Sequence, residues 1–199
     1  MGLLNKHAAP IFLIIMLSHT AIAGTSIDVD NSQIEWLGKK VTGQHNGSLN
    51  LKNGEVYIEK GALTGGRFVF DMTSIKVLDI KDPKWNSKLE KHLKNDDFFA
   101  TDKHPKAVFE FKEATPLKNA NAEAPNYAIA GDLTIKGITH VVKFQARVDI
   151  DKKQSRAQGE IIVDRTLYGI KYKSGKFFED IGDRAIYDDF QITFNVVTQ

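Results

Sequence analysis

The feature that most constrains this chain is a two-residue period of apolar side chains, which recurs from residue 24 to the end. Phe68, Phe70 and Met72 share one face of one segment, with Asp71 and Thr73 on the other. The same alternation is found in segments 107–112, 127–135, 142–150 and 190–196. Because successive side chains of a strand point to opposite faces, each segment predicts a half-buried antiparallel strand.

Shorter alternating segments predict the remaining strands. They are residues 32–42, 47–52, 54–62 and 157–164. Asn53-Gly54 and Lys136-Gly137 are typical hairpin turns, and residues 151–153 are a further turn candidate. Eight or nine strands in short-range succession favour an all-β fold, either an antiparallel barrel or a sandwich, and barrel closure removes exposed sheet edges.

One segment departs from this period and predicts a helix over residues 86–94. Asp82 is a typical N-cap, and Pro83 suits the first helical position. One apolar stripe follows at helical spacing, formed by Trp85, Leu89 and Leu93. A lone helix of this length needs tertiary contacts, so we expect it to pack on the barrel, across one end.

The N-terminus has the pattern of a secretory signal peptide. Lys6 is followed by the apolar run 10–17 and by Ala21-Ile22-Ala23, the small-x-small pattern of a cleavage site. The apolar run is too short to cross a bilayer, which takes roughly 20 residues. We therefore expect cleavage after Ala23, and a periplasmic or secreted single domain over residues 24–199 with no integral membrane segment.

Composition excludes several classes of partner and linkage. The 27 basic and 25 acidic side chains nearly balance, so net charge gives no reason to expect binding to nucleic acid or to anionic membranes. The chain has no cysteine, which rules out both disulfides and a lipidated N-terminal cysteine. An exported domain of this kind must therefore be held together by its core.

The aromatic residues admit two interpretations. The chain has 12 Phe, five Tyr and two Trp, and many stand on the apolar faces of predicted strands. They could fill an ordinary core, or they could line a hollow lumen, because a barrel of about eight strands is just wide enough for side chains or one small ligand. Composition alone leaves both open. The candidate ligand contacts are Trp36, Phe68, Phe70, Phe109, Phe111, Phe144 and Phe194.

Basic and aromatic residues interleave in the segment 164–176. Arg165, Lys171 and Lys173 are candidates to hold the polar head group of a ligand at a pocket mouth. The alternative is that these side chains belong to an ordinary solvated strand and loop.

Motifs for catalysis or metal binding are absent from the sequence. No HxH, HxxxH or HExxH pattern, nucleophile elbow, P-loop or dinucleotide fingerprint occurs. His92 stands four residues before Asp96, at helical spacing for a weak carboxylate–imidazole pair. We expect no enzyme activity, no metal and no cofactor. An enzyme would require His45 or His92 to pair with a carboxylate inside a pocket.

Several motifs, in one order, resemble the YceI-like family of exported lipocalin-like barrels. The first is Gly131-Asp132-Leu133-Thr134-Ile135-Lys136-Gly137-Ile138-Thr139. The others are the segments 92–99 (HLKNDDFF), 104–109 (HPKAVF), 71–75 (DMTSI) and 164–170 (DRTLYGI).

The resemblance implies a lipocalin-like, eight-stranded antiparallel barrel with one short helical segment. It also implies a lumen that carries or sequesters a long apolar lipid, such as a polyisoprenoid, an isoprenoid quinone or a similar amphiphile, and no catalytic residues. The alternative function is an envelope stress or interaction protein whose barrel is filled by side chains. The sequence leaves a homodimer open.

Overall fold

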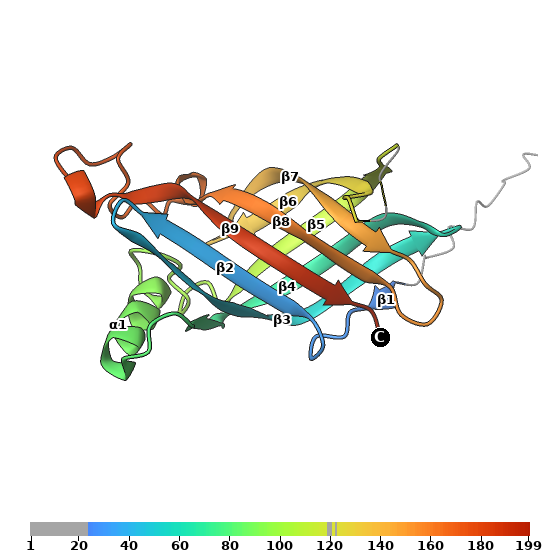
Figure 1. Cartoon of the computed structure of the whole chain (residues 1–199), viewed down its shortest axis with the longest axis horizontal. Coiled ribbons are helices and arrows are strands. Elements are labelled where there is room, and N and C mark those ends of the chain that lie inside the picture. The colour runs from blue at the N-terminus through green and yellow to red at the C-terminus, as the bar shows by residue number, and fades with distance from the viewer. Residues whose placement is uncertain (1–23, 119–120, 122) are drawn as a thin grey trace, which may run out of the picture.

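The computed structural model describes residues 24–118, 121 and 123–199, so the predicted signal peptide and its cleavage after Ala23 lie outside the described residues. The described chain is mostly strand, with one α-helix beside the barrel at one end (Figure 1). The elements are β1 (Thr25–Ser26), β2 (Gln33–Lys40), β3 (Gly43–Glu59), β4 (Ala62–Val77), α1 (Pro83–Lys94), β5 (Lys106–Pro116), β6 (Tyr127–Ile135), β7 (Ile138–Asp149), β8 (Arg156–Asp164), the 3-10 turns η1 (Arg165–Tyr168) and η2 (Gly182–Arg184), and β9 (Ile186–Val197).

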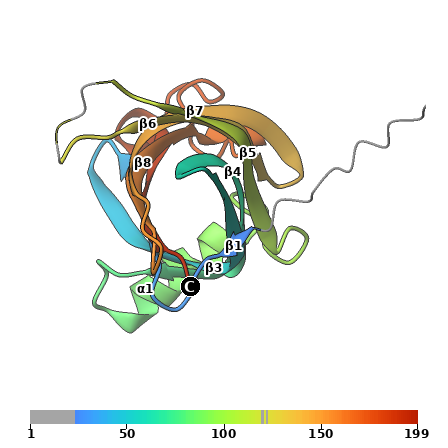
Figure 2. The same cartoon turned by 90° about the vertical axis from the view of Figure 1, so that its right-hand side faces the viewer.

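Strands β2 to β9 form a closed barrel. Each strand pairs antiparallel with the next along the chain, and β2 closes the ring by pairing with β9. Figure 2, which looks along the barrel, shows the strands arranged in a ring. The two-residue strand β1 adds only a short pairing with β3. The predicted eight-stranded antiparallel barrel is therefore confirmed.

The two-residue period arises because alternate side chains of a strand face the barrel interior and the solvent. Along β6, Tyr127, Ile129, Leu133 and Ile135 are buried in the barrel, whereas Asp132 faces outward and is exposed. Burial of the inward side chains supplies the driving force for folding, at roughly 25 cal/mol per Å² of apolar surface. One core therefore runs through the interior of the barrel.

One predicted turn is correct and another is wrong. Lys136 and Gly137 have φ angles of 53° and 76° and connect β6 to β7, as expected for a two-residue hairpin. Asn53-Gly54, in contrast, lies inside β3, where the register with β4 slips between Leu51 and Asn53. The irregularity is a bulge within one long strand, which a sequence pattern alone does not distinguish from a turn. The β3–β4 hairpin instead turns at Lys60 and Gly61, with φ angles of 51° and 80°.

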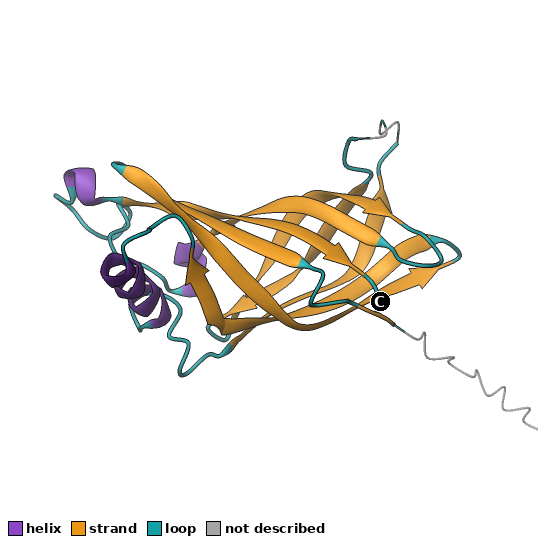
Figure 3. Ribbon diagram, turned by 60° about the horizontal axis from the view of Figure 1, so that its bottom comes forward, coloured by secondary structure: helices purple, strands orange, loops and turns teal. Residues whose placement is uncertain are grey.

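Helix α1 begins as predicted, because the Asp82 carboxylate accepts hydrogen bonds from the backbone N–H groups of Lys84 and Trp85 at 2.9 and 3.2 Å. The predicted apolar stripe, however, does not pack as a unit. Leu93 reaches the core, whereas 55% of Trp85 is exposed. Figure 3 shows the helix beside the end of the barrel rather than across its interior.

Polar side chains attach α1 to the end of β4. Asn86 donates hydrogen bonds to the carbonyls of Val77 and Ile80, at 2.9 and 3.0 Å. Glu90 accepts a hydrogen bond from the backbone N–H of Val77 at 3.0 Å. These contacts fix the helix through the face that carries Asn86 and Glu90, so the first-turn tryptophan remains at the surface.

Candidate functional site in the barrel lumen

The barrel encloses two adjoining cavities. Cavity 1 lies toward the chain termini and has an empty volume of about 740 Å³, and cavity 2 lies toward α1 with about 1040 Å³, both counting space open to solvent. Both cavities are lined by Ile34, Phe70, Phe109, Ile161 and Ile192, which form a common waist between them.

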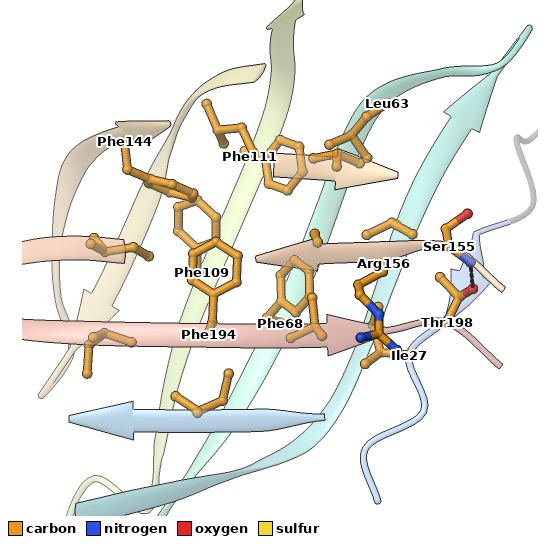
Figure 4. A pocket seen from close by; sticks show the side chains of 18 of the residues that line it. Ile27, Leu63, Phe68, Phe109, Phe111, Phe144, Ser155, Arg156, Phe194 and Thr198 are labelled. Atoms are coloured by element: carbon orange, nitrogen blue, oxygen red, sulfur yellow. Dashed lines mark hydrogen bonds between the residues drawn. The ribbon is translucent and has the colours of Figure 1, made fainter. Parts of the chain in front are cut away.

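All seven aromatic residues proposed from the sequence line these cavities. Phe68, Phe111, Phe144 and Phe194 line cavity 1, Trp36 lines cavity 2, and Phe70 and Phe109 line both. In Figure 4 the phenylalanine rings approach one another from different strands of the wall. Phe109 is central, with ring centroids 5.5 Å from Phe144 and 5.7 Å from Phe111. The structure places these residues on the lumen, and their contact with a ligand remains a prediction.

Strand glycines position several of these rings. A Cβ atom built on any of five glycines would come within 2.6–3.1 Å of a ring on the neighbouring strand. The pairs are Gly47 with Trp36, Gly54 with Phe68, Gly66 with Phe111, Gly131 with Phe109, and Gly159 with Phe194. Each ring therefore occupies space that a side chain on the adjacent strand would fill, and a strand glycine typically marks such a close approach. The rings lie against the wall, which preserves empty volume along the axis.

Part of the lining was not among the ligand contacts predicted from the sequence. Ile34, Ile161 and Ile192 lie at the waist. Ile34 and Ile192 could have been predicted, because each stands two residues before a proposed contact, Trp36 and Phe194 respectively, on the same strand face. Arg156 was also missed because the expected strand began one residue later. It is the single charged residue among the described residues that line cavity 1, and it makes no side-chain hydrogen bond or ion pair within the described chain.

Arg165 lies at cavity 2 but is already engaged by the protein. It is 4% exposed, and its guanidinium donates hydrogen bonds to the carbonyls of Tyr187, Ile170 and Ile186 at 2.8–3.0 Å. Asp188 lies 3.6 Å away. Burial lowers the pKa of the guanidinium, and the nearby carboxylates oppose that shift. These contacts make Arg165 a structural tie between the segment after β8 and the start of β9.

Lys171 and Lys173 are not among the described residues that line either cavity. The Lys171 ammonium lies 4.7 Å from the centre of the Phe177 ring, and that of Lys173 lies 5.3 Å from the centre of the Tyr172 ring. The geometry thus separates these two lysines from Arg165, which the sequence had grouped with them. Their head-group role remains a prediction.

Two histidines pair with carboxylates outside the lumen. His45 lies 2.8 Å from Asp79, and His92 lies 2.9 Å from Asp97 rather than from the Asp96 that helical spacing indicated. Neither histidine lines cavity 1 or cavity 2. The described residues also contain no group of three His, Cys, Asp or Glu side chains arranged to hold a metal ion. No helix among them is long and apolar enough to span a bilayer.

Comparison with known proteins places this barrel in a family. The family model described as the YceI-like domain matches residues 26–198. The chain belongs to the YceI-like family. It is 35% identical over 94 residues to a UPF0312 protein of Staphylococcus aureus, covering 44% of this chain and 49% of that protein. A UPF0312 protein of Photorhabdus laumondii is 30% identical over 110 residues, covering 55% and 54%. The chain thus spans about half the length of the curated relatives it matches.

Solved structures share the fold at low sequence identity. BcnA of Burkholderia cenocepacia superposes with a TM-score of 0.66 at 19% identity, covering 87% of this chain and 99% of that chain. A protein of Saccharophagus degradans, described as a polyisoprenoid binding domain implicated in plant cell wall breakdown, superposes with a TM-score of 0.62 at 13% identity, covering 87% and 97%.

The structure gives physical roles to the motifs that suggested the YceI-like family. Gly131 lies under the ring of Phe109, and Gly137 provides the left-handed backbone of the β6–β7 turn. Arg165 and Gly169 belong to the segment after β8, where Gly169 has a φ of 72° and ends the η1 turn. These residues shape the barrel and its end.

Replacing Gly159 with alanine should narrow the lumen. The added Cβ would lie 2.8 Å from the Phe194 ring, so we expect the ring to swing from the wall toward the axis. Overpacking of this kind costs about 1–3 kcal/mol of stability. The measurement is urea denaturation together with a crystal structure of the variant. The double variant Gly159→Ala/Phe194→Leu should recover part of the loss, because the added Cβ would still lie 3.0 Å from the backbone carbonyl oxygen of Gln145. A double variant no more stable than the single one would contradict this explanation.

Asp164 should contribute stability that is lost in acid. Burial raises the pKa of its carboxyl, but hydrogen bonds from Thr166 and Lys176 outweigh this effect and leave the pKa below its usual value. A carboxyl with a lowered folded-state pKa stabilises the protein above its unfolded pKa of about 3.9 and loses that contribution as pH falls through the folded value. We expect Asp164→Asn to lower stability at pH 7 by about 1 kcal/mol, because the neutral amide can still cap η1 but loses the ion pair with Lys176.

The check is thermal unfolding from pH 7 to about pH 2. The gap in Tm between the parent protein and Asp164→Asn should shrink below about pH 4. A gap that stays constant over the whole range would show that ionisation of Asp164 makes no contribution.

Proposed function

We propose that this YceI-like protein binds a long apolar lipid in the barrel lumen and carries or sequesters it, with no enzymatic role. The observation that carries the proposal is the lining. Two adjoining cavities share an apolar waist, and their charged lining residues among the described residues are Arg156 in cavity 1 and Lys39, Arg165 and Asp189 in cavity 2. Such a lumen suits an amphiphile with one polar end and a hydrocarbon tail.

The energetics favour a tail rather than a compact ligand. Burial of hydrocarbon contributes about 0.8 kcal/mol per CH2 group, and the waist residues offer no buried polar partner to a ligand. The related fold described as a polyisoprenoid binding domain supports an isoprenoid, including an isoprenoid quinone, as the ligand class. The alternative, an envelope stress or interaction protein with a filled barrel, requires an interior packed by side chains. The two cavities make this alternative less favourable.

The test is native mass spectrometry of protein purified without detergent, followed by lipid extraction. We expect an added mass that corresponds to a prenyl lipid, and uptake of a polyprenyl alcohol by the delipidated protein. Protein that repeatedly carries no lipid and takes up no polyprenyl compound would refute the proposal.

A blocking variant makes the test specific to the lumen. Ile192→Trp would fill the waist, because Ile192 lines both cavities, and we expect lipid uptake to fall by about tenfold or more. Thr193→Trp is the matched control, since the exposed Thr193 is its neighbour on the opposite face of β9. Equal uptake by the two variants would place binding outside the lumen.

We further propose that the protein is exported, on the pattern of its first 23 residues. N-terminal sequencing of the protein recovered from a periplasmic extract or culture medium should begin at Gly24. Recovery of a chain with its first residues intact, and in the cytoplasm alone, would refute this proposal.

A further inference from the structure

Exposed apolar side chains gather at one end of the barrel. Ten large hydrophobic residues of the described chain are exposed; Trp85 lies in α1 itself, and the other nine lie in loops, in η1 or in the strand segments nearest the same end of the barrel. They are Val41, Leu78, Trp85, Ile138, Val141, Ile162, Leu167, Phe177, Phe178 and Tyr187. We call this end the helix end, and Figure 1 shows it opposite the C-terminus. The other end exposes no large apolar side chain among the described residues.

Lysines accompany the apolar residues of the helix end. Lys81, Lys84, Lys88 and Lys91 are exposed on and beside α1. The Lys88 ammonium lies 4.9 Å from the centre of the Trp85 ring, and none of these four forms an ion pair within the described chain. The acidic groups of the helix are already engaged, as Asp82 caps it and Glu90 bonds to Val77 and Lys76. The face around Trp85 is therefore both apolar and cationic.

The loop after β8 adds a second apolar patch at the helix end. Phe177 and Phe178 are each 48% exposed. Lys171 stacks on Phe177, whereas Glu179, Asp180 and Asp183 follow in the same loop. This patch supplies apolar contacts with little net charge, so the cationic character of the helix end comes from α1.

Cavity 2 reaches the surface at this same end. The register between β2 and β9 slips between Gly38 and Lys40, and the exposed residues Lys39, Tyr187 and Asp189 line the cavity at that irregularity. The slip leaves the two strands less tightly joined there than along the rest of their pairing. A lipid tail that entered cavity 2 would pass close to the exposed ring of Tyr187.

From these observations we propose that the helix end docks on the surface of an anionic phospholipid bilayer, where the opening of cavity 2 meets lipid. Exposed tryptophan and phenylalanine insert at the level of the head groups, and lysines beside them gain from the negative surface. A second copy of this chain is a poorer partner, because it would bring the same unpaired lysines together. The role of the surface in lipid exchange rests on the proposed function, whereas docking itself does not.

Removing one of the two tryptophans of the chain allows docking to be followed at Trp85 alone. In the mature Trp36→Phe variant, Trp85 is the one remaining tryptophan, which can be excited selectively over the tyrosines. We expect its emission to shift to the blue and to be quenched by brominated lipid on addition of phosphatidylglycerol vesicles. The shift should be weak with phosphatidylcholine and should decrease with salt. No shift with phosphatidylglycerol at low salt would overturn the proposal.

Matched charge variants test the surface. In Lys81→Gln/Lys84→Gln/Lys88→Gln, sedimentation with phosphatidylglycerol vesicles should weaken by about fivefold per lysine. The control is Lys118→Gln/Lys152→Gln/Lys153→Gln at the other end, which should bind vesicles like the parent. Equal loss of vesicle binding in both variants would indicate nonspecific electrostatic attraction. A concentration-dependent dimer that buries Trp85, without vesicle binding, would assign this face to self-association. Either outcome overturns the proposal.

Lumen binding is followed in the same triple variants by native mass spectrometry with a polyprenyl alcohol in the absence of vesicles. We expect the Lys81→Gln/Lys84→Gln/Lys88→Gln variant to take up the polyprenyl alcohol like the parent protein although its docking on vesicles is lost. Failure of uptake in every protein, with docking intact, would refute the proposed function and leave the docking surface standing.

Discussion

The hollow interior depends on the contact between aromatic rings and strand glycines. In a barrel of eight strands, an inward aromatic ring can either project toward the barrel axis or lie against the wall. Here five rings lie against the wall, each over a glycine of the neighbouring strand. Replacement of such a glycine by a larger residue would return the ring to the axis. The empty volume of the lumen is thus a property of pairs of strands rather than of any single residue.

The two ends of the barrel differ because different contacts finish them. At the helix end, the Arg165 guanidinium donates hydrogen bonds to three backbone carbonyls, and these bonds hold the segment after β8 against β9. Asn86 and Glu90 hold α1 by polar contacts to the end of β4. Both arrangements use buried or half-buried polar groups for position, which leaves apolar side chains such as Trp85 at the surface. The same contacts therefore shape the cavity and expose the surface that we propose docks on a lipid bilayer.

Much of the fold could be predicted because strand and helix signals are local. The two-residue period separated the apolar face of each strand from its polar face, and all seven aromatic residues proposed from it line the lumen. Asp82 located the start of α1 for the same reason, since an N-cap acts on backbone groups two and three residues away. Asn53-Gly54 was misread because one bulged strand and two short strands have the same local pattern.

By itself, the sequence determined the class of fold, the apolar face of each strand and the helix start, because each depends on residues close together in the chain. Only the tertiary structure decided whether the rings filled the axis, since Gly131 and Phe109 belong to different strands whose register sets their contact. The tertiary structure also decided that Arg165 serves the backbone and that Trp85 faces outward. These outcomes depend on partners distant in sequence, which no periodicity specifies.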